Sequence, residues 1–149
     1  MPDFDAIAVA LAGRFSSANV TPPVGFQNIR VATADLPGQM TVLPAVLIFA
    51  DNGDFQTGNG QRQGGHQFTA RFYLTEAGLG DLPRDMPVLR KWLTVLVDQY
   101  KLAAQLGGIV SSCRLMTWKI GIMDYAGVTY SGIEMGVHVV TNEGWAAVS

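Results

Sequence analysis

Strand-like segments come in pairs in this sequence of 149 residues, and a single long helix-like segment separates the two pairs. Strands that follow one another directly form hairpins and antiparallel sheets, whereas strict alternation of strand and helix produces a parallel sheet. The order therefore predicts an α+β fold. We expect a mainly antiparallel β-sheet of two hairpins, packed against an N-terminal helix and a long central helix.

The first pair of strands flanks a polar segment. Residues 45–49 form a continuous apolar run of strand length, which predicts a strand covered on both faces. Residues 67–74 alternate between apolar and polar side chains, which is the two-residue period of a strand. Residues 51–66 between them are rich in Gly, Gln and Asn and offer little to bury. We therefore expect a hairpin with a long Gly/Gln/Asn-rich loop at 51–66.

The second pair of strands follows the central helix. Residues 113–123 and 129–140 both alternate at the period of a strand, and residues 124–127 supply a turn between them. Residues 29–32 can add a short further strand. In the last strand one face is apolar, and the other carries Gly132, Glu134, Gly136 and His138.

The two helical segments have clear apolar stripes. Asp3 can cap the first, in which apolar residues recur at helical spacing as far as Phe15. The second has Pro87 in its first turn and continues for about 19 residues, until Gly107 and Gly108 end it. Both stripes predict helices packed on a core.

Core residues can be named from the same patterns. Trp92 lies in the stripe of the second helix and is expected in the core. Met116, Met123 and Met135 are expected there too, since methionine commonly fills irregular gaps in a core.

The composition combines high hydrophobicity with little charge. Hydrophobic residues make up 48% of the chain and charged residues only 15%, where about 25% is usual. Disordered chains have the opposite balance. The net charge of -2 argues against a nucleic-acid binder, which needs a basic face. We expect a single domain over residues 1–149, with part of its surface reserved for other protein chains.

Cysteine content and hydropathy restrict the class further. Cys113 is the only cysteine, which excludes an intramolecular disulfide and a Cys-rich zinc site. The N-terminus has no basic segment typical of a signal peptide. The longest apolar stretch, residues 43–50, is too short to span a membrane. These features predict a soluble protein of a reducing compartment with no membrane partner.

No catalytic, cofactor or metal motif emerges from the sequence. Residues 51–66 contain neither glycine-rich phosphate-binding pattern, and a strand rather than a helix follows them. The two histidines, His66 and His138, together with Glu134 leave open an alternative as a small enzyme or ligand-binding domain. We expect no enzymatic activity, no cofactor and no metal.

Two regions are candidates for protein contacts. A long loop in a compact domain is often functional, and glycine inside a strand often marks the close approach of another backbone. The candidate interface residues are Asp54, Phe55, Gln56, Gln61, Arg62 and Gln63 in the loop, and Gly132, Glu134, Gly136 and His138 in the last strand.

Several local patterns, in this order, resemble a known family. They cover most of the chain, and they occur at residues 43–49, 71–74, 81–83, 89–93, 118–121 and 125–134. Together they resemble the tail terminator (tail completion) proteins of long non-contractile-tailed bacteriophages and related phage-like particles.

The resemblance implies a structural virion protein without catalytic residues. Its subunits would close into a homo-oligomeric ring, typically a hexamer, at the head-proximal end of the tail. The ring would stop polymerisation of the major tail tube protein and join the tube to the head-tail connector protein, with DNA only passing through its lumen. Assembly would take place in the host cytoplasm. A different connector component, such as a head-completion or stopper protein, is the alternative within this class.

Overall fold

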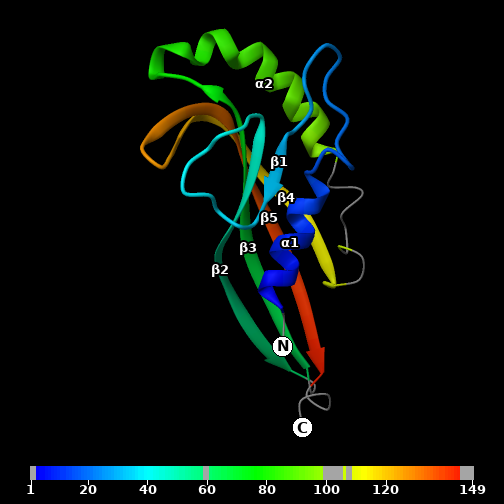
Figure 1. Cartoon of the computed structure of the whole chain (residues 1–149). Coiled ribbons are helices and arrows are strands. Elements are labelled where there is room, and N and C mark those ends of the chain that lie inside the picture. The colour runs from blue at the N-terminus through cyan, green and yellow to red at the C-terminus, as the bar shows by residue number, and fades with distance from the viewer. Residues whose placement is uncertain (1–2, 59–60, 99–105, 107–108, 145–149) are drawn as a thin grey trace.

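The computed structural model describes residues 3–58, 61–98, 106 and 109–144. The fold is α+β, as predicted, with a five-stranded mixed sheet and two α-helices (Figure 1). The elements in chain order are α1 (Phe4–Arg14), β1 (Val31–Thr33), β2 (Ala45–Gly58), β3 (Gln61–Glu76), the 3-10 helix η1 (Leu79–Asp81), α2 (Leu82–Val97), β4 (Ser112–Tyr125) and β5 (Val128–Gly144).

All five strands belong to one sheet, in the order β1-β2-β3-β5-β4. Strands β2 and β3 pair antiparallel, as do β4 and β5, and β5 also pairs antiparallel with β3. The two strand pairs therefore form a continuous sheet. Strand β1 pairs parallel with the first three residues of β2, which makes the sheet mixed.

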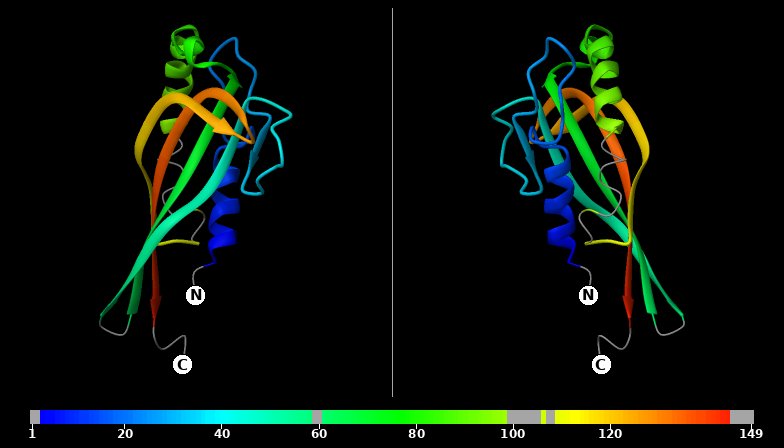
Figure 2. Two further views of the ribbon diagram at one scale, coloured as in Figure 1. Left: turned by 90° about the vertical axis from the view of Figure 1, so that its left-hand side faces the viewer. Right: turned by 90° about the vertical axis from the view of Figure 1, so that its right-hand side faces the viewer.

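The prediction of a long loop at 51–66 is wrong. Strand β2 continues to Gly58 and β3 starts at Gln61, and their register runs unbroken from the pair Asn52–Gln67 to the pair Gly58–Gln61. Strand β5 flanks the same stretch of β3 on its other side. Gly, Gln and Asn form strands poorly, but here their backbone groups are paired between β2, β3 and β5, which keeps the segment extended. In both views of Figure 2 the hairpin reaches past the N-terminal end of α1.

The sheet has two different faces. Both helices pack on one face, here called the helix face, where Ile48, Phe72 and Ile133 contribute to the main core. On the other, the open face, Leu47 and Tyr73 form a smaller cluster with Tyr130. The apolar run at 45–49 is thus covered on both sides, as its pattern predicted. The open face beyond this cluster carries polar side chains.

Most of the predicted core is confirmed. Trp92 and Met135 are fully buried, and Met123 packs against the smaller cluster. Met116 is an exception, because 57% of it is exposed. It lies at a β-bulge between Leu115 and Thr117, where alternation is interrupted, and β4 is the edge strand of the sheet that the described residues form.

The helix boundaries differ slightly from the sequence expectation. Asp3 caps α1 as predicted, since its Oδ1 accepts a hydrogen bond from the Ala6 N–H at 3.0 Å. Helix α2 begins at Leu82, so the prediction that Pro87 lies in its first turn is wrong. Pro83 occupies the first turn, where its missing N–H costs nothing, and Pro87 lies inside the helix. Its expected end falls among residues 99–108, of which the structure describes only residue 106. Neither described helix is long and apolar enough to cross a membrane.

Candidate protein interface

The predicted interface residues lie in two places. Gly132, Glu134, Gly136 and His138 occupy the open face of β5, which is also the face of Arg71 and Lys119. The remaining six belong to the β2–β3 hairpin, where Asp54, Phe55 and Gln63 are exposed. Gln56, Gln61 and Arg62 are strand residues, and their side chains lie outside what the structure describes.

An ion pair marks the middle of the open face. The Arg71 guanidinium on β3 lies 3.0 Å from the Glu134 carboxylate on β5, and both side chains are partly exposed. Arg71 also lies over the Phe49 ring, 5.0 Å from its centroid. Arg71 thus contacts neighbours on two strands, and the pair forms part of a polar surface on the open face. Because both side chains are partly solvated, the pair itself adds little stability.

The two β5 glycines are explained by contacts within the chain. A Cβ at Gly132 would lie 2.1 Å from the Phe72 carbonyl oxygen, and one at Gly136 would lie 2.4 Å from Thr117 Oγ1. Both glycines are buried. The close approach that glycine permits is therefore made by neighbouring strands of the same molecule, and the glycines are no argument for a partner.

The structure brings three predicted residues together. Asp54 of β2, Gln63 of β3 and His138 of β5 line a shallow cavity of about 230 Å³ on the open face. Gly65 also lines this cavity, and a Cβ there would meet the His138 ring at 3.2 Å and Asp54 Oδ1 at 3.5 Å. One carboxylate, one amide and one imidazole make a polar surface suited to hydrogen bonding with another protein.

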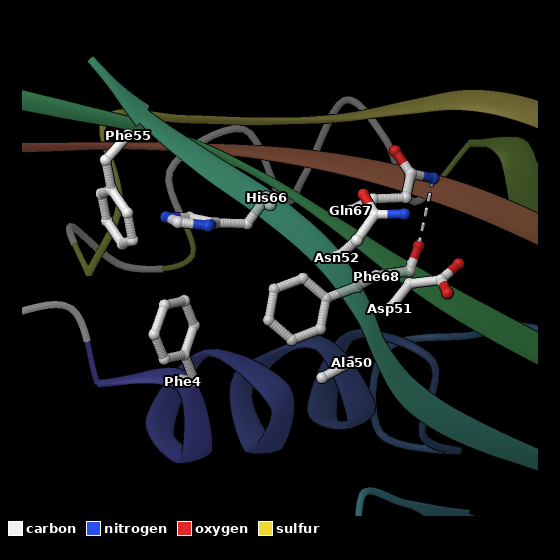
Figure 3. A pocket seen from close by; sticks show the side chains of 9 residues that line it. Phe4, Ala50, Asp51, Asn52, Phe55, His66, Gln67 and Phe68 are labelled. Atoms are coloured by element: carbon white, nitrogen blue, oxygen red, sulfur yellow. Dashed lines mark hydrogen bonds between the residues drawn. The ribbon is translucent and has the colours of Figure 1, made fainter.

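A second cavity, of about 250 Å³, lies on the helix face of the hairpin (Figure 3). Its centre is His66, which is only 3% exposed. The His66 ring contacts the rings of Phe4 and Phe55 edge-on, at centroid distances of 4.9 and 5.0 Å. One ring nitrogen, Nε2, lies 3.2 Å from Thr141 Oγ1 on β5. His66 therefore joins α1, both strands of the hairpin and β5.

Two glycines make room for this histidine. A Cβ at Gly53 would lie 2.4 Å from His66 Nδ1, and one at Gly64 would lie 2.5 Å from His66 Nε2. Real Cβ atoms do not come that close, so a larger residue at either position has to displace the ring. The glycines of this segment thus have a structural role that its composition did not reveal.

The histidines do not form a joint site. His66 lies on the helix face and His138 on the open face, so the sheet separates them. Within the described part of the chain, no three His, Cys, Asp or Glu side chains are grouped to hold a metal ion. Burial raises the pKa of the Cys113 thiol to about 11, which keeps it protonated and unreactive near neutral pH.

Sequence reasoning missed one exposed surface. Trp118 on β4 pairs with the buried Met135 and points to the helix face, yet 55% of it is exposed. It lines a groove between β4 and α2 with Met86, Arg90, Leu93, Thr94, Lys119 and Ile120. Only the order of strands in the sheet reveals this surface, because alternation does not distinguish an edge strand from a central one.

No protein-family model matches the chain, and no curated protein is significantly similar to it.

Proposed function

We propose that this protein is a structural component of a virion that closes into a ring and terminates the tail tube. In this proposal the ring, a hexamer of identical subunits, sits at the head-proximal end of the tail and joins the tube to the head connector. Its partners are further copies of itself, the major tail tube protein and the connector protein.

The observation that carries the proposal is the presence of two dissimilar surfaces on one small domain. One is the projecting β2–β3 hairpin with exposed Asp54 and Phe55, and the other is the groove along β4 with exposed Trp118. A ring subunit contacts one neighbour through one patch and the other neighbour through a different patch. Such heterologous contacts form a ring when the rotation between subunits closes. The family resemblance of the sequence supplies the link to phage tails.

The low content of charged residues is consistent with a ring-forming subunit and with a lumen that DNA passes through. Interface cores are depleted in charged residues, and only 15% of this chain is charged. A lumen through which DNA passes has to avoid tight binding of phosphate, and a chain of net charge -2 does not offer a strongly basic lining.

Polymerising tail tubes provide the test. The purified protein is added to its cognate major tail tube protein during tube growth, and the products are imaged by electron microscopy. We expect shorter tubes with a ring at one end. Tubes of unchanged length without rings would contradict the proposal. Capture of the portal protein instead of the tube protein in a pull-down would favour a head-completion or stopper role.

A further inference from the structure

Among the described residues, the sheet ends at β4 on one side, and on the other side β1 pairs with only part of β2. Strand β4 is the last strand on one side, and its outer edge has no strand partner among the described residues. On the other side, β1 covers β2 only at residues 45–47. No other strand of the described part of the chain pairs with the outer edge of β2 between Ile48 and Gly58. Uncovered edges present backbone groups that can pair with another strand.

The edge formed by β4 has an aromatic side chain on one face and a cation on the other. Trp118 points to the helix face beside α2, and Lys119 points to the open face. Both are exposed, as is Arg90, which borders the same groove from α2. This edge is therefore basic and partly aromatic.

The distal edge of β2 has the complementary pattern. Phe55 lies on the helix face, where it contacts His66, and 46% of it remains exposed. Asp54 lies on the open face and is exposed. Two consecutive residues thus place an aromatic ring and an acid on the same faces on which Trp118 and Lys119 place an aromatic ring and a base.

One molecule cannot bring its own two edges together. The register aligns Trp118 with Met135, Ala70 and Ile48 across the sheet. Phe55 lies seven residues beyond Ile48 in the chain, which is roughly 20 Å along a strand. Strands β3 and β5 also separate the two edges. A second copy is needed to bring Phe55 to Trp118.

We propose that the distal edge of β2 in one copy pairs with the β4 edge of the next copy. Phe55 packs on Trp118 over the helix face, and Asp54 pairs with Lys119 on the open face. This inference rests on the self-association in the proposed function and names the residues that perform it. Each subunit gives its hairpin to one neighbour and its groove to the other, so the contact is heterologous.

Two complementary variants test the contact. Phe55→Ser removes the anchor of the hairpin, and Trp118→Ser removes the floor of the groove. We expect size-exclusion chromatography with light scattering to show oligomers for the wild type and monomers for each variant alone. An equimolar mixture should give a heterodimer and nothing larger, because the intact hairpin of Trp118→Ser fits the intact groove of Phe55→Ser and both outer surfaces are then defective.

A charge exchange provides an independent check. Asp54→Lys and Lys119→Asp should each weaken association, and the two together in one chain should restore it. Val9→Ser is the matched control, since Val9 on α1 is 54% exposed and belongs to neither edge. It should assemble as the wild type does. Circular dichroism establishes that every variant is folded.

Three outcomes would overturn the inference. These are a monomeric wild type at every soluble concentration, single variants that assemble normally, or a mixture of folded variants that stays monomeric. A wild-type monomer that binds the tail tube protein through Trp118 would assign the groove to that protein instead. Tube termination is measured separately, so a ring that caps tubes with Phe55→Ser or Trp118→Ser leaves the proposed function standing while the edge contact fails.

Discussion

The helix-covered part of the sheet and the distal hairpin are stabilised in different ways. Around Trp92, large apolar side chains from α2, β3 and β5 pack together, and the Trp92 ring lies 4.8 Å from that of Phe72. In the distal hairpin, paired backbone groups and the contacts of His66 hold the strands. The comparison shows that one sheet can continue well beyond its apolar core when glycines admit a single large polar ring.

The largest expected effect concerns Trp92. Trp92 is fully buried, so Trp92→Ala should lower the free energy of unfolding by about 3–5 kcal/mol through lost burial and a residual cavity. Urea titration measures the change. Trp118→Ala is the control, because Trp118 is largely exposed and its loss should cost far less. Equal losses for the two variants would show that the covered region does not depend on this core.

The distal hairpin should depend on glycine instead. Gly64→Ala places a methyl group where the His66 ring now lies, and we expect a loss of about 1–3 kcal/mol from overpacking. Gly38→Ala is the control, since a Cβ at Gly38 meets no atom within 4 Å. In a His66→Ala background the cost of Gly64→Ala should shrink, because the clash with the ring is gone and only the approach to Thr141 Oγ1, at 2.9 Å, remains. Additive losses in this double-mutant cycle would show that Gly64 does not make room for the His66 ring.

Sequence patterns predicted the covered region better than the hairpin. Alternation and the apolar run at 45–49 are direct consequences of burial, so Trp92, Met135 and the two-faced strand were identified correctly. Composition cannot reveal that Gly53 and Gly64 surround His66, because that contact depends on strand register. The exposure of Trp118 and Met116 depends on strand order, which local periodicity does not encode. The interface residues themselves remain predictions.

Cys113 lies where the two regions meet, and it predicts a dependence on pH. Cys113 on β4 pairs with Val139, and Val139 pairs with His66. Burial raises the pKa of its thiol from 9.0 to about 11. The folded state therefore favours the neutral thiol. Its contribution to the free energy of unfolding is fully present below pH 9 and is lost as the pH rises towards 11. The loss should reach at most about 2 kcal/mol.

Thermal melts of the wild type and Cys113→Ala between pH 8 and pH 11 measure this decline. The wild type should lose more stability than the variant over that range, although Tyr130 and other groups contribute a common background. A native thiol that reacts with an alkylating reagent at pH 8 as fast as in urea would show that Cys113 is not protected by burial.

The smallest effect concerns the start of α1, which links the two regions. Asp3 caps this helix through the Ala6 N–H, and the next residue, Phe4, contacts His66 in the hairpin. Asp3→Ala should cost about 1 kcal/mol, whereas Asp3→Ser, which retains a capping oxygen, should cost less. Because Phe4 forms one side of the His66 site, loosening the first turn should also increase hydrogen exchange in the hairpin amides of residues 53–55. Exchange that rises only within α1 would mean that the hairpin is held by its own ladder and by β5, without support from the helix.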